Sequence, residues 1–250
     1  MVDMHPSLAA TAHRPWPLPS GRWTWRQSWR DLLFAHWPVP ASRLRPFVPE
    51  LLSIQEWEGT SFVGVVPFRM AGVMRRPFPD VPWLSAFPEL NVRLYVQRDG
   101  RPGVWFLSLD ATNPIAVWAA RRFFHLPYIR ARIDIERRGE VLRFRSHRAG
   151  GDDPAMFQAE FQPVSGVRLA EPGTLEHFLT ERYCLYARSP DGALFRTEVH
   201  HEPWPLQEAR AEVDAAGILS SHGLALSEPP ALVHFAQRLD VVVWPPHRCA

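Results

Sequence analysis

The sequence contains no lysine: its 28 basic residues are all arginines, set against 26 acidic residues. Without a side-chain amine, no residue of the chain can form a Schiff base with a ketone through its side chain. The formal net charge of +2 is also too small to indicate a nucleic-acid partner. The lack of lysine therefore excludes imine chemistry at a side chain.

Cysteine is scarce as well, with only Cys184 and Cys249 in the chain. Two cysteines make neither a disulfide framework nor a zinc site, and we expect no metal and no cofactor. No run of 18 apolar residues is present, which excludes a membrane-spanning helix. The first 22 residues hold no apolar segment of signal-peptide length, so we expect a cytoplasmic protein.

The 250 residues, 46% of them hydrophobic, suit a globular chain without stabilising cross-links. Residues 1–22 are predicted to form a flexible N-terminal arm, and residues 23–250 a single domain. Within "RWTWRQSWR", Trp23, Trp25, Gln27 and Trp29 alternate with mostly arginine. This alternation is typical of a half-buried strand, and it favours a strand over a single-stranded nucleic-acid surface.

About ten to twelve strands and two or three short helices follow from the remaining patterns. Their connections are short and hairpin-like, which predicts a largely antiparallel sheet that closes into a barrel or packs as two sheets. The segment "NPIAVWAARRFF" is predicted to be a helix with Asn113 as its N-cap and Pro114 at its first position. Residues 71–88 hold four prolines and no clear period, so we expect a mobile loop that covers a site.

The stretch "FPELNVRLYV" at residues 87–96 raises the main question about function. Its even-numbered residues are apolar, whereas Glu89, Asn91, Arg93 and Tyr95 occupy the opposite face of a strand. Glu89 is a solvated charge, half of a buried ion pair, or an acid in a pocket. Arg93 lies about 13 Å from Glu89 along the strand and cannot bond to it directly. Desolvation is therefore expected to raise the pKa of a pocket carboxyl here.

Several long segments resemble the YqjF-like family, which is placed in the acetoacetate decarboxylase-like superfamily. They include "LLFAHWPVP", "VGVVPFRM", "FPELNVR", "GVWFLSLDA", "ARRFFHLPY", "LEHFLTERYCLY", "HHEPWPLQ" and "RLDVVVWP". The resemblance runs from about Arg26 to Trp244, and the family has no established activity. It implies a mostly β fold with a few short helices: an antiparallel, cone-shaped barrel around a small-molecule cavity.

The resemblance also implies where a decarboxylase site would lie. Glu89 matches the superfamily's strand glutamate, and Leu126-Pro127 matches the end of the helix that precedes the catalytic lysine. The lysine position then falls on Tyr128, with Ile129 where a second basic residue would lower the pKa of the first. A phenol can donate a hydrogen bond or a proton, but it cannot make an imine. Imine decarboxylation is therefore rejected, and Glu89 and Tyr128 become the candidate catalytic pair.

Other polar residues are candidates for binding a substrate. Arg69 ends an uncharged strand and can hold a carboxylate or reach water. Asn91 and Arg93 share the face of Glu89. His200 and His201 point to opposite faces of a strand and cannot chelate a metal together, but His201 can face a cavity as an acid or base.

Ser108 and Asp110 invite comparison with a catalytic triad, but no Gly-x-Ser-x-Gly elbow accompanies them.

Two functions are consistent with these residues. The first is a non-imine lyase, hydratase or isomerase acting on a small oxo or carboxylic acid, with Glu89 as acid or base. The second is a non-catalytic small-molecule binder that has lost the decarboxylase chemistry. A purely structural protein is a third reading, and it predicts a cavity filled by side chains. The expected partner is a small organic acid or oxo compound, with no nucleic acid and no membrane; a homo-oligomer is left open.

Overall fold

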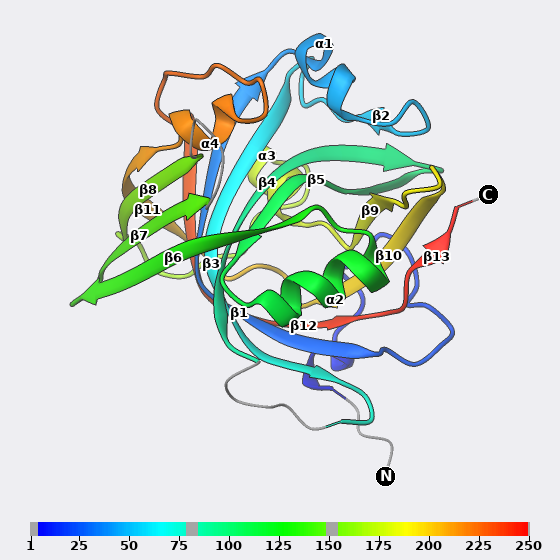
Figure 1. Ribbon diagram of the computed structural model, residues 1–250. Helices are drawn as coiled ribbons and strands as arrows, with labels where there is room; N and C mark the ends of the chain where they lie inside the picture. The colour runs from blue at the N-terminus through cyan, green and yellow to red at the C-terminus, as the bar shows by residue number, and fades with distance from the viewer. Residues whose placement is uncertain (1–4, 79–84, 149–154, 250) are drawn as a thin grey trace.

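The computed structural model describes residues 5–78, 85–148 and 155–249. The described strands are β1 Trp25–Val39, β2 Ser53–Ile54, β3 Ser61–Arg75, β4 Phe87–Arg98, β5 Arg101–Ala111, β6 Tyr128–Arg138, β7 Val141–Arg148, β8 Met156–Pro163, β9 Cys184–Arg188, β10 Leu194–His201, β11 Leu206–Asp214, β12 Leu232–Val243 and β13 His247–Arg248. The helices are α1 Ala41–Leu44, α2 Pro114–Phe124, α3 Leu175–Thr180 and α4 Ala216–Ser220, with short 3-10 turns at Pro6–Ala9 and Arg45–Phe47. The chain is thus mostly β with a few short helices (Figure 1).

The strands form one sheet in the order β13-β10-β9-β5-β6-β7-β8-β11-β12-β1-β3-β4-β2, with additional β10–β12 and β4–β5 pairs. These pairs make two closed circuits that share the wall β12-β1-β3-β4-β5. One circuit returns through β9 and β10, and the other through β6, β7, β8 and β11. β5 pairs with both β6 and β9 in parallel, so the sheet is mixed and a purely antiparallel barrel is not confirmed.

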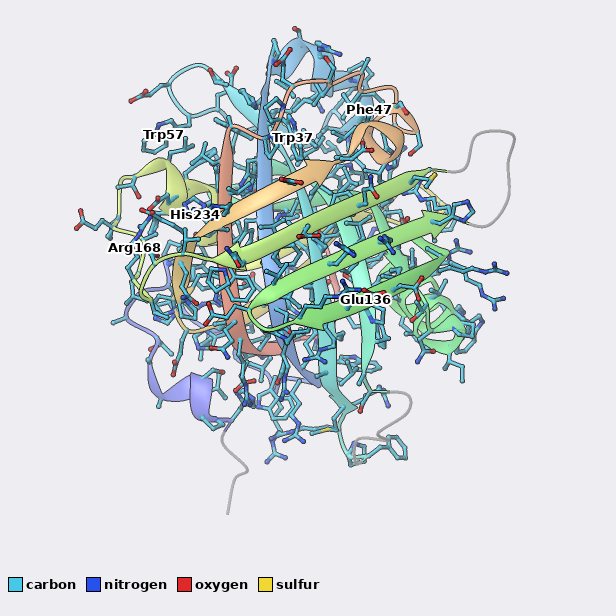
Figure 2. The ribbon with its side chains drawn as sticks, turned by 90° about the vertical axis from the view of Figure 1, so that its left-hand side faces the viewer. Trp37, Phe47, Trp57, Glu136, Arg168 and His234 are labelled. Carbon is cyan, nitrogen blue, oxygen red and sulfur yellow. The ribbon has the colours of Figure 1, made fainter. Side chains whose placement is uncertain are left out.

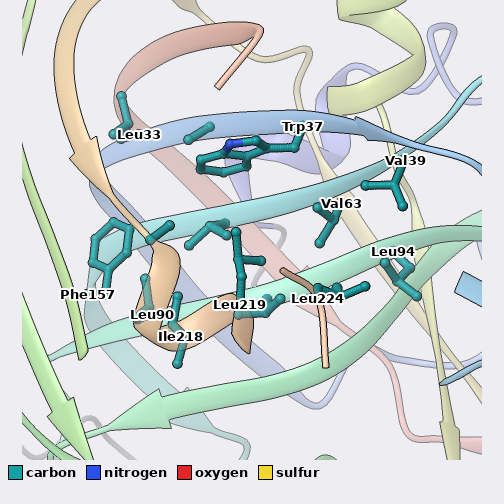
Figure 3. Close-up of a cluster of buried hydrophobic side chains, with 14 of the residues drawn as sticks. Leu33, Trp37, Val39, Val63, Leu90, Leu94, Phe157, Ile218, Leu219 and Leu224 are labelled. Atoms are coloured by element: carbon teal, nitrogen blue, oxygen red, sulfur yellow. The ribbon is translucent and has the colours of Figure 1, made fainter. Parts of the chain in front are cut away.

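The shared wall is buried on both faces. Leu90, Val92 and Leu94 of β4 lie in one core, together with β1, β3 and helix α4 (Figure 3). Glu89, Asn91 and Arg93 point to the other side, where a second core gathers around Phe34, Phe68 and Trp204. A strand enclosed between two layers has no solvent face, so the polar row of β4 is interior.

The outer face of β6, β7, β8 and β11 is polar and faces the viewer in Figure 2. Along β8, exposed and buried residues alternate, and Arg143 of β7 donates to Glu160 of β8 at 2.6 Å. Beside this face, Glu176 accepts from both Arg168 (2.5 Å) and His234 (3.0 Å), and the Arg168 bond holds its pKa near 2. This side of the molecule is an ordinary solvated surface with exposed or half-buried ion pairs.

The loop predicted at residues 71–88 is shorter than expected, which corrects the sequence analysis. β3 continues to Arg75 because its last residues pair with the start of β1, and β4 begins already at Phe87. The expected cover over the site falls largely on residues 79–84, which lie outside the described residues.

The first described residues lie against β10. Arg14 has a side chain only 1% exposed and bonds to Glu198 at 3.1 Å, and Trp16 donates to the same carboxylate at 2.7 Å. Trp23 is buried as well. The segment predicted as a flexible arm therefore makes specific interior contacts from residue 5 onward, and its mobility stays a prediction.

Helix α2 begins as the sequence predicts. The Asn113 side chain accepts from the backbone N–H groups of Ile115 and Ala116, and Pro114 follows at the first helical position. The helix ends at His125, which adopts a left-handed conformation. Within the described ranges, no helix is long and apolar enough to span a bilayer.

Candidate functional site

A cavity of about 190 Å³ lies inside the circuit that runs through β9 and β10. Side chains from all seven strands of this circuit line it, and α2 closes one side with Ala116, Ala119, Ala120 and Phe124. Most of the wall is aromatic or aliphatic; its largest side chains are Trp25, Trp29, Phe87, Phe106, Phe124 and Trp204. The cavity is therefore a partly open, mostly apolar site with few polar groups, as small-molecule sites usually are.

Two predicted residues meet at its edge. Tyr128, the first residue of β6, lines the cavity, and its hydroxyl donates to Oε2 of Glu89 at 2.7 Å. Register explains the meeting, because Tyr128 pairs with Leu109 of β5, and Leu109 pairs with Asn91 of β4. Glu89 is only 2% exposed and does not itself line the cavity; it contacts the lining residue Tyr128.

Burial raises the pKa of Glu89 to about 8, partly opposed by the hydrogen bonds from Tyr128 and Asn91. The Asp110 charge adds a smaller upward effect. Desolvation thus outweighs the other influences, as the sequence analysis expects. Burial and the neighbouring Glu89 also raise the pKa of Tyr128 well above its ordinary value, so it stays a phenol. At neutral pH this pair is mostly a carboxylic acid beside a phenol, which is a proton donor.

Arg93 also faces the cavity, but it does not approach Glu89. Its guanidinium lies over Phe34 and Tyr95, with Cζ 5.0 and 5.7 Å from the ring centres. Within the described residues its Nε and Nη2 have no hydrogen-bond partner and it forms no ion pair. A buried cation without a carboxylate is costly for a protein, so a ligand is the natural partner.

Arg182 is a cavity residue that the sequence analysis missed. It is buried, and its Cζ lies 5.1 Å from the centre of the Tyr95 ring, so both arginines share one aromatic neighbour. It donates to Gln55 and to the carbonyl of Phe178, while its Nε is unpartnered. Burial lowers its pKa to about 10, and the Arg93 charge contributes to this shift. The segment "TERYCL" gives no local signal for this role, because Arg182 follows a short helix and precedes β9.

Unpartnered polar atoms gather around this cavity. Within the described residues they include Oγ1 of Thr197, Nε1 of Trp29 and Nε1 of Trp204, all on cavity-lining side chains, in addition to the arginine nitrogens. Thr197 is 1% exposed. Such atoms are rare in native interiors, and each calls for an explanation.

The remaining predicted binding residues are placed differently. Arg69 is wrong as a cavity residue: Phe68 and Met70 face the cavity side, so Arg69 points away and donates to Asp31 at 2.9 Å near the surface. Asn91 is buried beside Glu89 but does not line the cavity.

His201 does line the cavity, stacked on Tyr183 at 4.7 Å. Its Nδ1 and Nε2 lie 2.7 and 3.3 Å from the carbonyl oxygens of Glu202 and Arg182. Burial lowers its pKa, opposed by the Glu181 charge and by these backbone contacts. These backbone contacts suit a wall residue better than a proton carrier.

Ser108 and Asp110 lie on the other side of the wall. Ser108 Oγ is 2.9 Å from Nε2 of His222, but Asp110 binds Arg148 at 2.7 Å instead of the histidine. Ser108 is wholly buried. The arrangement is a structural polar cluster and not a triad. The described residues contain no group of three His, Cys, Asp or Glu side chains that would hold a metal ion.

Comparison with known proteins places this geometry in context. The profile of the DUF2071 family, described as an uncharacterized conserved protein, matches residues 26–240. An uncharacterized protein of Bacillus subtilis, YqjF, is 42% identical over 228 residues, which cover 91% of this chain and 93% of that protein.

Solved structures with the same fold are more distant in sequence. Acetoacetate decarboxylase from Legionella pneumophila superposes with a TM-score of 0.63 at 14% identity, covering 99% of this chain and 97% of that one. The enduracididine biosynthesis enzyme MppR, solved with pyruvate, superposes with a TM-score of 0.62 at 12% identity over 95% and 93% of the two chains. An acetoacetate decarboxylase-like enzyme from Sphingomonas wittichii RW1 gives 0.63 at 12% identity over 92% and 94%. These likenesses identify the fold.

Proposed function

Since the chain belongs to the DUF2071 family and has an acetoacetate decarboxylase-like fold, we propose that it is an enzyme acting on small oxo or carboxylic acids without a covalent lysine. The reaction class is a lyase, hydratase or isomerase. The observation that carries the proposal is the 2.7 Å hydrogen bond between Glu89 and Tyr128, a residue that lines the cavity.

The pair suits proton transfer to a substrate oxygen. Tyr128 lines the cavity and its hydroxyl contacts Glu89, which holds a proton up to a pH of about 8. A water molecule takes the α-proton of an oxo acid, and the electron pair of the broken Cα–H bond moves to the carbonyl oxygen. In the free protein the Tyr128 hydroxyl donates to Glu89. With a substrate bound, the protonated Glu89 donates to the phenol oxygen instead, so that the phenol can donate to the enolate oxygen and supply the proton. Arg93 holds the acid group of the same substrate.

The absence of lysine also limits how the reaction can proceed. No lysine is present to make an imine, so the carbonyl oxygen itself must take the developing charge. A general acid near its oxygen is then the minimum requirement.

Exchange of α-protons for deuterium tests the proposal without knowledge of the natural substrate. Pyruvate and other small oxo acids are incubated with the protein in D₂O and followed by proton NMR. Exchange is expected with the parent and lost by at least about tenfold in Glu89→Gln and Tyr128→Phe. Arg69→Gln is the matched control, since this predicted site residue lies outside the cavity.

The alternative function is a non-catalytic small-molecule binder. The empty volume and the unpartnered arginine nitrogens support it equally well. Binding of an oxo acid without any exchange would favour this alternative. Neither binding nor exchange, across the whole panel, would reject both functions. A structural protein with a filled interior is disfavoured by the cavity itself.

A further inference from the structure

On the side chains that line the cavity, the buried polar atoms without a partner among the described residues are nearly all donors. Arg93 contributes Nε and Nη2, Arg182 contributes Nε, Trp29 and Trp204 contribute indole N–H groups, and Thr197 a hydroxyl. Arginine and indole nitrogens cannot accept hydrogen bonds. A ligand that satisfies this set must therefore present several acceptor oxygens.

The charges point the same way. Two buried guanidinium groups lie against one ring, that of Tyr95, and the described residues offer no ion pair to either. Two cations held together in an apolar interior repel one another, and an anion placed between them removes the repulsion. A carboxylate matches the planar geometry of both forks.

The rest of the wall favours an apolar group attached to the acid. Trp25, Phe87, Phe106 and Phe124 surround the space that the arginines leave, and α2 adds only alanine methyl groups beside Phe124. An apolar cavity of about 150 Å³ accommodates benzene, and this one measures about 190 Å³. The space therefore fits one ring and a carboxylate.

We propose that the cavity binds an arylcarboxylate, with its carboxylate on Arg93, Arg182 and Thr197 and its ring among the aromatic side chains and α2. The inference deepens the proposed function, on which it rests, by naming the chemical class of ligand. It makes Arg182 and Thr197 specificity-determining residues.

A substitution at Thr197 is the most specific test of the binding site. Its hydroxyl is buried without a partner, so Thr197→Val preserves the shape and removes only an unsatisfied group. Arg93→Met likewise removes a cation that forms no ion pair among the described residues and whose Nε and Nη2 have no hydrogen-bond partner. Neither change is expected to lower the melting temperature without ligand. A purely structural role predicts the opposite.

Calorimetry with benzoate as the probe tests the binding. Benzyl alcohol serves as its uncharged counterpart, and acetate, malonate and pyruvate as small acids without a ring. Benzoate is expected to bind at least about tenfold more tightly than benzyl alcohol and acetate, and Arg93→Met to weaken benzoate by a similar factor. Thr197→Val should weaken it several-fold. Arg45→Met is the control, since Arg45 bonds to three backbone carbonyls away from the cavity.

Each other outcome overturns the inference in a distinguishable way. Equal affinity for benzoate and benzyl alcohol would show that the cavity has no site for an anion. Binding of pyruvate or malonate without benzoate would reject the arylcarboxylate and leave the proposed function standing. No binding of any acid would reject both. A melting temperature lowered by Arg93→Met or Thr197→Val to the level of Arg45→Met would make these residues structural.

Discussion

Glu89 lies where a carboxyl group is hard to ionise, and this has a consequence for stability. Its pKa is about 8 in the folded protein, against an ordinary value near 4.5 in the unfolded chain. Below the lower value the group is protonated in both states. As the pH rises from about 4.5 to 8, only the unfolded chain releases the proton, so the folded state loses stability across this window.

The first prediction isolates this effect with Glu89→Gln, which keeps the shape and removes the titration. From pH 5 to pH 9 the parent should lose about 4 kcal/mol of unfolding free energy relative to the variant. Urea unfolding of both proteins at the two pH values measures the difference. Parallel pH profiles would show that Glu89 is ionised in the folded state, and it would then no longer serve as the acid.

The second prediction concerns the space beside Arg93. A Cβ on Gly64 would lie 3.1 Å from the Tyr95 hydroxyl oxygen and 3.3 Å from both Cγ of Arg93 and Cδ2 of His36. These side chains are packed and His36 bonds to Tyr95 at 2.6 Å, so Gly64→Ala must displace one of them. We expect a loss of about 1–3 kcal/mol in unfolding free energy and weaker binding of acids.

Gly166→Ala is the control for this experiment, because nothing lies within 4 Å of its added Cβ. Unfolding in urea gives the stabilities and calorimetry gives the affinities. If Gly64→Ala behaves like Gly166→Ala, then the packing around Arg93 yields more easily than the distances indicate.

For single residues, the sequence predicts which side chains of β4 share a face, but it does not predict what surrounds that face. Alternation along β4 places Glu89, Asn91 and Arg93 together, as observed. That this face is interior depends on β9, β10 and β12, strands more than 80 positions away. For the same reason the sequence does not predict that Arg182 and Thr197 line the cavity, because the residues next to them in the chain show no pattern typical of a cavity.

At the scale of elements, α2 is the case where local signals suffice. Asn113 followed by Pro114 fixes the start of the helix through two hydrogen bonds that involve only adjacent residues. The extent of β3 is the opposite case. "AGVMR" has no strand period of its own, and it becomes strand because β1 pairs with it. Element boundaries set by remote partners cannot be read from the segment alone.

The third prediction tests α2 as the cover of the cavity. Asn113→Ala removes the cap and should lower the unfolding free energy by about 1 kcal/mol. Because Ala116, Ala119 and Ala120 of α2 line the cavity, ligand affinity should fall as well, which calorimetry measures. Asn113→Asp retains an acceptor and should restore both quantities. A loss of stability with unchanged affinity would separate the helix from the site.

At the scale of the whole molecule, the absence of lysine makes a prediction about covalent chemistry. After incubation with acetoacetate and borohydride, the intact mass should show no adduct on an internal residue. Peptide mapping excludes the N-terminal amine as the source of any mass increase. A stable internal adduct would mean that another nucleophile has taken the role of the missing amine. The fold resembles that of acetoacetate decarboxylase, so this result would also bear on how much chemistry the fold retains.

The last prediction concerns the N-terminal segment, which contacts β10 far along the chain. Arg14 and Trp16 donate to Glu198, 184 and 182 positions away, and Arg101 and Arg196 bind the same carboxylate. A run of charges or a helical pattern would have indicated that this segment is ordered. The sequence "HPSLAATAHRPW" has neither, so it predicts a flexible arm.

Deleting residues 1–16 removes two of the four donors from a carboxylate that stays buried. The remaining arginines keep Glu198 paired, so we expect a loss of about 3 kcal/mol, at the lower end of the range for breaking a buried pair. Glu198→Gln should cost at least as much, because it leaves Arg14 buried without its partner. Urea unfolding compares both with Glu136→Gln, an exposed carboxylate on the outer face in Figure 2. If the deletion leaves stability unchanged, the segment is a loose arm in solution, its contacts with Glu198 are transient, and the fold begins at β1.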